Sequence, residues 1–268
     1  MNSKFLTAFF IAGLTMLTSF GVFAQQDTLK KQDSLQKTAV KKGFKFSVAV
    51  NDTMGSAPNP KGRFVGGLTF TRFDLGFTRL VDNGNFTLSP VNDFLDYKAY
   101  KSSTVSFDLL DFGYRFNTNF KVYLAAGLDW TMLRLEKDIT IRRNTAALEY
   151  DPSAVDFSKN RFSSFYVHIP LGFQFRSKEN DRGKRFYFVL SPEVSFLLNG
   201  KVKQVSKENG KQKFRDDYTF EPMRLGGSVR VGYGWIGLFS KYYFNDMFDS
   251  APQAGLRNMS FGITFWLN

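Results

Sequence analysis

The stretch Leu256–Asn268 reads LRNMSFGITFWLN and decides the fold. Apolar side chains stand at every second position from Met259 to Leu267, and the positions between them are mostly polar or small. Because successive side chains of an extended chain point to opposite faces, this pattern predicts a strand with one apolar face. At the edge of a soluble sheet such a face would invite aggregation, whereas a membrane β-barrel pairs its last strand with its first. We therefore expect Leu256–Asn268 to close a transmembrane barrel.

Seven stretches earlier in the chain have a similar length and a similar alternation. A tilted strand needs about 9 to 11 residues to cross a bilayer. With the last stretch included, strands are predicted at residues 72–81, 103–116, 120–135, 163–176, 185–198, 222–232, 235–244 and 256–268. The predicted fold is all-β, an eight-stranded antiparallel transmembrane β-barrel of the outer-membrane type, in which the first of these strands pairs with the last.

The connections between the predicted strands alternate in length. The short ones are residues 117–119, 177–184 and 232–235, and the long polar ones are residues 82–101, 137–161, 199–221 and 245–255. Outer-membrane barrels have short periplasmic turns and longer external loops. The alternation and the even number of strands predict that the N-terminus and the C-terminus are both periplasmic.

The N-terminal part of the chain predicts an export signal followed by a linker. A short basic start, the apolar residues 5–23 and the Val22-Phe23-Ala24 cleavage pattern predict a signal peptide at residues 1–24. Residues 25–62 are predicted to be a periplasmic linker with an extra strand at 44–50, and residues 63–268 the barrel domain. The apolar positions change parity after Phe70, which predicts a bulge or a change of element. One alternative therefore pairs the extra strand with residues 63–70 outside the barrel proper.

Composition and charge exclude several classes of protein. The 268 residues are 43% apolar and include 32 phenylalanines, so the chain is not globally disordered. The chain has no cysteine, which removes disulfides, thiolate catalysis and cysteine metal sites. Beyond residue 24 no apolar run reaches the roughly 20 residues of a spanning helix. The net charge of +12 in an exported protein predicts anionic membrane lipid, and no nucleic acid, as the partner.

Several motifs in the predicted strands carry a family resemblance. They are Phe73-Asp74-Leu75-Gly76-Phe77, Gly127-Leu128-Asp129-Trp130, Tyr166-Val167-His168-Ile169-Pro170-Leu171 and Arg230-Val231-Gly232-Tyr233-Gly234. They resemble the PorT-like outer-membrane β-barrel family, a porin-family group common in Bacteroidota, over about residues 63–268. The resemblance implies a barrel, and one branch of the family assists protein secretion. An aromatic last residue is usual for recognition by the barrel insertion machinery, and here Phe265 is expected to serve instead.

The interior of an eight-stranded barrel is just wide enough to be filled by side chains. Three acids and three bases are predicted to face it, and we expect them to neutralise one another because a confined charge is costly unless it is paired. This predicted lumen charge network consists of Asp74, Asp129, Glu193, Arg224, Arg230 and Lys241. The alternative is a path for protons or small solutes.

His168 is the only histidine, and its strand parity points it inward. Outer-membrane enzymes that trim lipid A use a Ser/His/acid set, which should lie on the lipid-facing surface. The neighbour of His168 on the same face is Pro170 rather than a serine. No catalytic, cofactor-binding or metal-binding residues are predicted, and no ligand spacing supports zinc.

Three local irregularities are predicted within the strands. Asp108 and Asp111 flank a change of parity, for which a bulge with one solvated aspartate is favoured over a pair of catalytic carboxylates. Pro170 predicts a break in the hydrogen-bonded ladder. Trp235 and Trp266 have inward parity, which leaves open an interfacial girdle or a plug at the periplasmic end of the barrel.

The long loop 199–221 has an excess of basic residues. We predict either a solvated hairpin or a contact with glycolipid phosphates outside the cell, made by charge-assisted hydrogen bonds. The residues predicted for this contact are Lys201, Lys203, Lys207, Lys211, Lys213 and Arg215.

The sequence predicts a non-enzymatic outer-membrane barrel with a side-chain-filled lumen and a structural or interaction role at the cell surface. Its expected contacts are outer-membrane lipid, lipopolysaccharide and the barrel insertion machinery, and no cofactor is predicted. A narrow channel or a secretion-accessory barrel is the alternative, and a lipid-modifying enzyme is the third possibility.

Overall fold

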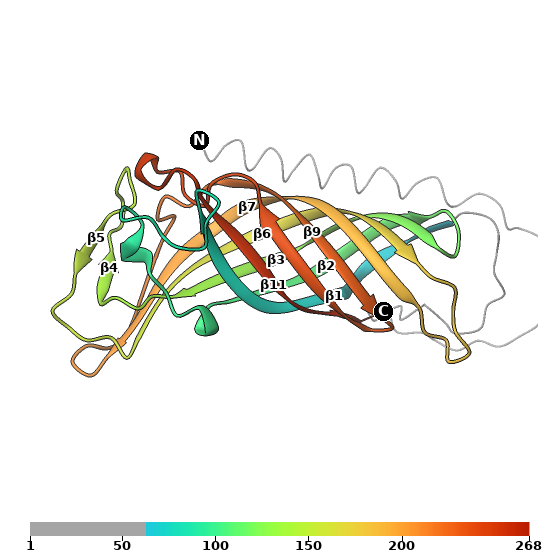
Figure 1. Cartoon of the computed structure of the whole chain (residues 1–268), viewed down its shortest axis with the longest axis horizontal. Coiled ribbons are helices and arrows are strands. Elements are labelled where there is room, and N and C mark those ends of the chain that lie inside the picture. Colours follow the sequence, from blue (N-terminus) through green and yellow to red (C-terminus); the bar gives the residue numbers. More distant parts are fainter. Residues whose placement is uncertain (1–62, 268) are drawn as a thin grey trace, which may run out of the picture. The chain divides into compact units, whose positions relative to one another are not determined.

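The computed structural model describes residues 63–267, and these residues form an all-β structure (Figure 1). No helix among them is long and apolar enough to cross a membrane. Eight strands pair edge to edge in a closed antiparallel ring, which confirms the predicted fold class. In ring order they are β1 (Arg63–Asp82), β2 (Ser103–Arg115), β3 (Phe120–Arg134), β6 (Lys159–Arg176), β7 (Phe186–Ser206), β9 (Met223–Tyr233), β10 (Ile236–Tyr243) and β11 (Leu256–Trp266).

The remaining elements lie in the connections between the ring strands. The strands β4 (Ile139–Ile141) and β5 (Tyr150–Pro152) form a small hairpin, and β8 (Gly210–Asp216) pairs with the end of β7. Three short 3-10 helices complete the set: η1 (Asp93–Leu95), η2 (Ala99–Lys101) and η3 (Ala251–Gln253). We call the end of the barrel that carries the short connections the turn end, and the end that carries the long connections, where β4 and β5 lie, the loop end (Figure 1).

The last strand closes the ring as its sequence predicts. Residues of β11 pair with β1 in a continuous antiparallel register from Arg72↔Trp266 to Asp82↔Leu256. Between its two ends, β11 directs Met259, Phe261, Ile263 and Phe265 outward, and Asn258, Ser260 and Thr264 are buried inside. The predicted pairing of residues 72–81 with the last strand is confirmed.

The first strand is longer than predicted. It begins at Arg63, and its segment Arg63–Leu68 pairs with Arg115–Leu110 of β2. The register shifts between Leu68 and Arg72, so the change of parity is a bulge within one strand. The alternative that placed residues 63–70 outside the barrel is therefore wrong. The predicted signal peptide at 1–24, the linker at 25–62 and the strand at 44–50 lie outside the described residues.

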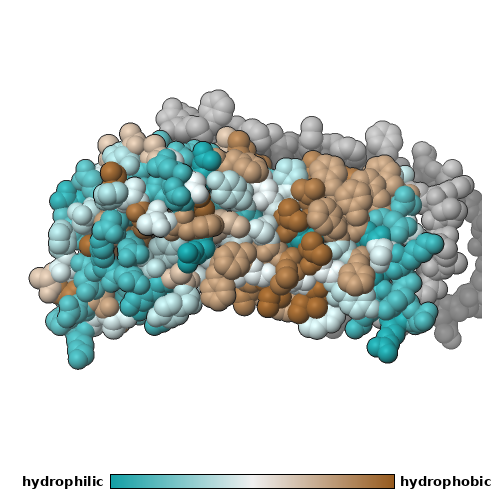
Figure 2. Space-filling view, viewed as in Figure 1, coloured by the Kyte–Doolittle hydropathy of each residue, from teal (hydrophilic) through white to brown (hydrophobic). Residues whose placement is uncertain are grey.

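An apolar band surrounds the outside of the barrel. Even positions of β3 and odd positions of β6 face outward, as predicted, and the apolar outer residues of β6 run from Phe165 to Phe175. This length matches the about 9 to 11 residues that a tilted strand needs to cross a bilayer. Figure 2 shows the apolar band between two hydrophilic ends.

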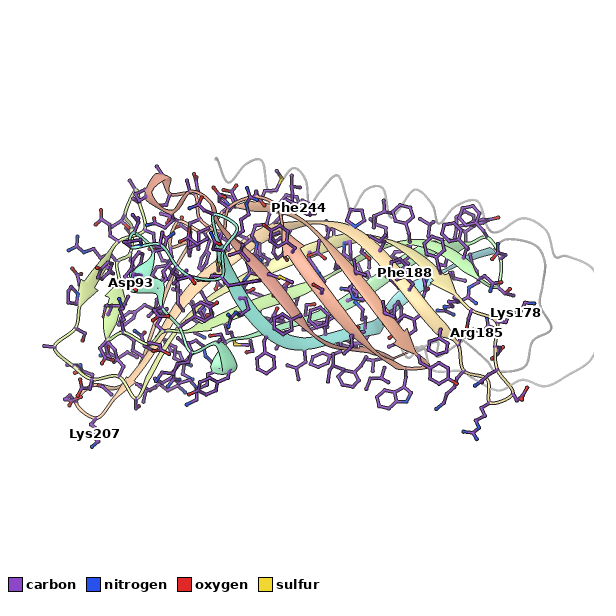
Figure 3. The ribbon with its side chains drawn as sticks, viewed as in Figure 1. Asp93, Lys178, Arg185, Phe188, Lys207 and Phe244 are labelled. Carbon is purple, nitrogen blue, oxygen red and sulfur yellow. The ribbon has the colours of Figure 1, made fainter. Side chains whose placement is uncertain are left out.

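The basic connection at 199–221 is largely a hairpin, which is one of the two interpretations given to it from the sequence. The strand β7 continues to Ser206 and turns back into β8, with pairs from Gly200↔Asp216 to Ser206↔Gly210. A register shift between Phe165 and Tyr166 marks a bulge in β7, and the buried positions of β7 change from odd to even residue numbers across it. The hairpin projects beyond the ring at the loop end, and Lys207 lies at its tip (Figure 3).

Aromatic side chains at the turn end of the band contact one another from strand to strand. Ring contacts join Phe64 to Tyr114, Tyr114 to Phe116, Phe116 to Phe120, Phe120 to Phe175, Phe175 to Phe188, Phe186 to Tyr233 and Trp235 to Phe265. Aromatic rings of this kind are typical of a membrane–water interface. Trp235 belongs to this outer set with 58% of its surface exposed, so its predicted inward parity is wrong.

Two buried apolar clusters lie at opposite ends of the described strands. The turn-end plug consists of Tyr123, Ala125, Tyr187, Val189 and Trp266. The loop-end cap combines strand residues such as Leu80, Leu133 and Phe162 with loop residues such as Phe94 and Phe248. Trp266 is 8% exposed and contacts the rings of Tyr123 and Tyr187, so the sequence-based alternative of a plug at this end is the correct one for Trp266.

Glycines make room for the large rings of the turn-end plug. A Cβ atom at Gly172 would lie 2.1 Å from the Tyr123 ring, and one at Gly232 would lie 2.2 Å from the Tyr187 hydroxyl oxygen. Neither contact is sterically allowed, so both positions require glycine for the rings to lie flat against the strands. This requirement explains why glycine interrupts otherwise regular alternation there.

The substitution Gly172→Ala is expected to lower the free energy of unfolding by about 1–3 kcal/mol, because the added methyl group overpacks the plug against Tyr123. Urea unfolding of the detergent-refolded protein measures this change. Gly67→Ala is the matched control, since a Cβ atom at Gly67 meets nothing within 4 Å. Equal stability of the two variants would contradict the packing role of Gly172.

Candidate functional site

The interior between the two apolar clusters contains a layer of charged side chains. Along β3 the inward residues pass from Tyr123 in the plug through Asp129 to Leu133 in the cap, and along β11 they pass from Trp266 through Ser260 to Leu256 in the cap. The charged layer holds four acids and four bases, each at most 5% exposed: Asp74, Asp108, Asp129, Glu193, Arg72, Arg224, Arg230 and Lys241. The formal charges of these four acids and four bases are therefore equal and opposite.

One half of the charged layer joins β1, β2 and β9. The Arg230 guanidinium donates to Oδ2 of Asp74 at 2.8 Å, and Arg72 donates to Asp108 at 2.8 Å. Nε of Arg72 also lies 3.5 Å from Oδ2 of Asp74, which links the two pairs. Arg230 donates a further hydrogen bond to Ser228 Oγ at 2.7 Å. Buried charges are tolerated when they are paired and hydrogen-bonded in this way.

The other half of the layer is centred on Lys241 of β10. Its ammonium group donates to Oδ2 of Asp129 at 2.6 Å and lies 3.2 Å from Oε1 of Glu193. The Tyr243 hydroxyl group is 3.1 Å from Oδ2 of Asp129 and 3.0 Å from Oε1 of Glu193. A single ammonium group therefore lies between two carboxylates contributed by β3 and β7.

Arg224 differs from the other buried bases because aromatic rings surround it. Its guanidinium carbon lies 3.7 Å from the centre of the Tyr166 ring and 4.0 Å from the centre of the Tyr243 ring. Cation–π attraction is strongest where the cation is desolvated, as it is here. None of its three guanidinium nitrogens has a hydrogen-bond partner within the described residues. Its charge is thus accommodated by ring faces rather than by a direct ion pair.

All six residues of the predicted lumen network lie in this layer. The structure brings Asp74 and Arg230 together, and likewise Asp129, Glu193 and Lys241, while Arg224 lies against tyrosines. Sequence reasoning missed Arg72 and Asp108. A signal for Arg72 was present, because it lies two residues before Asp74 and shares its inward parity. Asp108 was hidden by the bulge next to it.

The two aspartates at the bulge of β2 are both buried. The register of β2 and β3 shifts between Asp108 and Leu110, as the parity change predicts. The expectation that one aspartate is solvated is wrong, because Asp108 and Asp111 are 1% and 4% exposed. Asp111 accepts both of its hydrogen bonds at 3.0 Å from Lys121. Each carboxylate has its own base, so the two do not form an acid/base pair.

His168 points into the lumen, as predicted, and is 0% exposed. Its Nε2 atom lies 3.0 Å from Oδ1 of Asp108, and Ser195 is its residue partner on β7. Asp108, His168 and Ser195 thus have the residue types of an Asp/His/Ser catalytic set. However, no hydrogen bond joins Ser195 to either ring nitrogen of His168 in the described part of the chain. The Ser195 hydroxyl group is instead 3.5 Å from the Tyr243 hydroxyl group. The arrangement lacks the nucleophile–base contact that acyl transfer needs.

A potential metal-ligand set occurs in the same layer. One ligand atom each from Asp129, His168 and Glu193 lies within 4.8 Å of the others. The Lys241 ammonium group already contacts both carboxylates, so it takes the position and the charge that a cation would supply. These residues therefore fit an internal ion cluster better than a metal centre.

Pro170 interrupts the pairing of β6 without changing its register. The pairs with β3 stop at Leu124↔Leu171 and resume at Gly127↔His168 in the same alignment. The predicted break in the ladder is confirmed, and it lies immediately beside His168.

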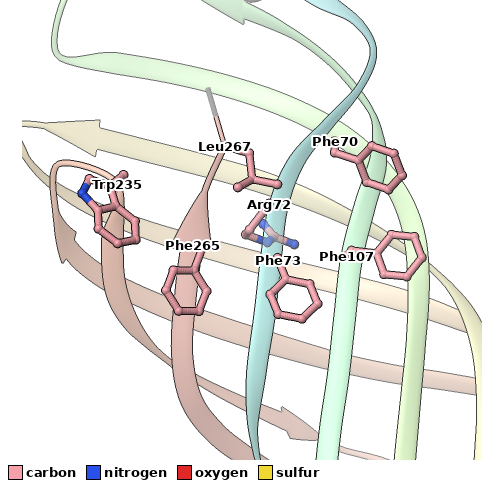
Figure 4. A pocket seen from close by; sticks show the side chains of 7 residues that line it. All are labelled: Phe70, Arg72, Phe73, Phe107, Trp235, Phe265 and Leu267. Carbon is pink, nitrogen blue, oxygen red and sulfur yellow. The ribbon is translucent and has the colours of Figure 1, made fainter.

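An outward groove lies next to the β1 bulge at the turn end (Figure 4). Its volume is about 360 Å³, and it is lined by Phe70, Arg72, Phe73, Phe107, Trp235, Phe265 and Leu267. The Arg72 guanidinium is directed away from the groove toward Asp108, so the lining offers no nucleophile or acid. The groove is suited to contact with hydrocarbon rather than to catalysis.

The residues predicted for glycolipid contact lie on the hairpin formed by β7 and β8. Lys201 and Lys203 are on β7, Lys207 is in the turn, and Lys211, Lys213 and Arg215 are on β8. They face the outside of the molecule and have no contact with the charged layer of the lumen.

Comparison with known proteins gives one family match. Residues 73–249 match the family model described as outer membrane protein beta-barrel domain. This range runs from β1 into the connection that follows β10. No curated protein matches the chain.

Proposed function

The chain belongs to the outer membrane protein beta-barrel domain family, and we propose that this outer-membrane barrel is closed to solutes and acts through its surface as a structural or interaction protein. In this proposal the lumen is filled by side chains and carries no enzymatic activity. The proposed orientation places the turn end and both termini in the periplasm and the loop end outside the cell, as in other outer-membrane barrels.

The observation that carries the proposal is the layering of the interior. A solute that entered from the turn end would meet Trp266 and Tyr187, which are 8% and 6% exposed. It would then meet eight charges that already neutralise one another, and then the apolar cap with Phe162 and Leu256, both 0% exposed. An eight-stranded ring leaves little space beyond that occupied by side chains.

The apolar cap at the loop end also supports a closed barrel, because the long connections help to form it. Outer-membrane channels keep a polar, water-filled interior. Here the connections instead insert Phe94, Tyr218, Phe220 and Phe248 into one cluster, each at most 6% exposed. The Phe220 and Phe248 rings stack with centres 4.9 Å apart. A loop cluster of this kind favours a closed external end.

In planar bilayers the purified protein is expected to produce no reproducible single-channel steps, because the plug, the charged layer and the cap leave no continuous aqueous path. Single-channel recording at both polarities measures this. The double variant Tyr187→Ala/Trp266→Ala, which opens only the plug, is expected to remain silent because the two inner layers persist. Regular conductance steps by the wild-type protein would overturn the closed-barrel proposal and favour a narrow channel.

The resemblance to the PorT-like family provides the second candidate, a secretion-accessory barrel. Such a role uses the surface and needs no open lumen, so it is compatible with the absence of single-channel conductance. Affinity purification of the full chain from outer membranes separates the candidates: co-purification of secretion components supports the accessory role, and recovery of lipid alone supports the structural one. Assays on lipid A and phospholipid substrates test the proposed absence of enzymatic activity.

A further inference from the structure

A group of basic side chains covers one side of the barrel just beyond the apolar band at the loop end. It includes five of the residues predicted on the β7–β8 hairpin, and it extends onto β3 and β6. We call this group the cation ladder; its members are Arg134, Lys159, Arg161, Lys201, Lys203, Lys211, Lys213 and Arg215. Lys207 is not part of it, because it lies at the hairpin tip (Figure 3).

The strand register aligns these bases directly opposite one another. Arg134 of β3 pairs with Arg161 of β6, Arg161 pairs with Lys203 of β7, and Lys203 pairs with Lys213 of β8. Four like charges therefore form one row across four adjacent strands. In the next row toward the band, Lys201 pairs with Arg215. Like charges directly opposite on neighbouring strands destabilise a sheet, so the arrangement has a cost that nothing in the fold requires.

No acidic side chain in the described structure offsets this charge. None of the ion pairs within 4.0 Å among residues 63–267 involves a member of the ladder. The Asp216 carboxylate, at the end of β8, accepts hydrogen bonds from the backbone N–H groups of Asn144 and Asp217. Repulsion from the Arg161 guanidinium lowers the pKa of the Lys159 ammonium group, which lies beyond the apolar band.

The ladder bases keep donors available for a ligand. Lys211, Lys213 and Arg215 are exposed, and the five ladder bases of β3, β6 and β7 are half-buried. Arg134 donates one hydrogen bond to the Ser158 carbonyl oxygen, and Nη1 of Arg161 is 3.4 Å from the Met132 sulfur. Among residues 63–267, the other guanidinium N–H groups of Arg134 and Arg161 make no further hydrogen bonds, so they are free to bind an anion.

The depth of the ladder corresponds to the headgroup region of a membrane. The last aromatic pair of the apolar band is Trp130 and Phe165, which stack with ring centres 4.2 Å apart. Arg134 and Arg161 lie four residues beyond them on the same outer faces. At about 3.3 Å per residue and a tilt of about 45°, this places the row about 9 Å beyond the hydrocarbon edge.

We propose that the cation ladder binds a glycolipid headgroup that carries two phosphates, of the lipid A type. Adjacent strands are about 4.8 Å apart, so the four-base row spans about 14 Å, which is wide for a phospholipid with one phosphate and suits two separate phosphates. Arginine binds phosphate through paired hydrogen bonds, and Arg134 and Arg161 lie side by side. The proposal rests on the proposed function, because it needs the loop end to face the outer leaflet.

The test compares two triple variants of the full chain that remove equal charge. Arg161→Gln/Lys203→Gln/Lys213→Gln removes three bases of the row. Lys178→Gln/Arg182→Gln/Lys184→Gln removes three bases from the connection between β6 and β7 at the turn end and serves as the control. Binding of purified lipid A to each protein is measured by calorimetry in zwitterionic detergent micelles. Monophosphorylated lipid A, an anionic phospholipid and inorganic phosphate are the comparison ligands.

The row variant is expected to bind lipid A at least about tenfold more weakly than the wild type, which corresponds to about 1.4 kcal/mol, whereas the control is expected to change by less than about twofold. The wild type is expected to bind monophosphorylated lipid A more weakly than lipid A, and inorganic phosphate more weakly still. Equal lipid A binding by the row variant and the wild type would overturn the proposal, as would equal affinity of the wild type for the anionic phospholipid.

Two further readouts separate this proposal from that of the closed barrel. Removing like charges from the row should leave the protein at least as resistant to urea as the wild type, so weaker binding by a resistant variant supports a binding role. A row variant that gives no channel steps in bilayers and binds lipid A normally would contradict the cation-ladder proposal and leave the closed-barrel proposal in place. Channel steps by a wild-type protein whose lipid A binding depends on the row would overturn the closed barrel alone.

Discussion

Deleting residues 265–268 is expected to abolish formation of the heat-resistant barrel and its stable insertion into membranes. The deletion removes the pairs Arg72↔Trp266 and Phe73↔Phe265, which hold the turn end of the ring closed. It leaves unpaired backbone groups of β1 and β10 in hydrocarbon, where each costs several kcal/mol. It also removes the Trp266 ring from the plug. The measurement is the mobility shift between unheated and boiled samples in detergent gels, combined with membrane fractionation.

The control for this deletion changes the same end of the chain without opening the ring. Leu267 lies just beyond β11, and its backbone N–H group donates to the Thr71 carbonyl oxygen at 3.0 Å. Leu267→Ser retains that hydrogen bond and is expected to insert and shift normally. A deletion variant that inserts and resists heat like the wild type would refute the closing role of β11.

Lys241→Met is expected to lower the free energy of unfolding by about 3–5 kcal/mol, because it leaves the carboxylates of Asp129 and Glu193 without the base that lies between them. Urea unfolding of the refolded protein in detergent, followed by tryptophan fluorescence, measures the loss. The substitution retains an unbranched side chain of similar length, so lost packing contributes little.

The double variant Asp129→Asn/Lys241→Met tests whether charge is the cause. It removes one charge of each sign and restores the electrical balance of the layer, so it is expected to recover more than half of the lost stability. Lys137→Met removes a base from an exposed ion pair with Asp93 at the loop end and is expected to leave stability unchanged. A double variant that is as unstable as the single variant would contradict the electrostatic origin of the loss.

The sequence allowed most of the ring to be predicted because each strand has a lipid face and an interior face. Alternation placed Asp129 inward on β3 and His168 inward on β6, and it placed Met259 and Phe261 outward on β11. The same rule selected the six lumen charges, because charged side chains at inward positions of a narrow barrel must lie close to one another and therefore need partners of opposite sign. Strand bounds were best predicted where polar turns flank the strands, as for β2 and β3.

The features that were missed occur where alternation fails or is absent. The bulges shift the parity of β1 after Leu68 and of β2 after Asp108, which hid the first segment of β1 and the burial of Asp108. The cap residues Phe94 and Phe248 lie in irregular connections, where no period marks the buried face. Their burial depends on contacts between connections distant in sequence.

The pairing pattern of the charged layer has a consequence for biogenesis. Asp74 of β1 obtains its main counter-charge from Arg230 of β9, and Asp129 of β3 obtains its own from Lys241 of β10. Before β9 joins, Arg72 is the only base of the layer available to both Asp74 and Asp108. The strands up to β7 carry four acids and one base of the layer, and the charges balance only once β9 and β10 contribute their three bases.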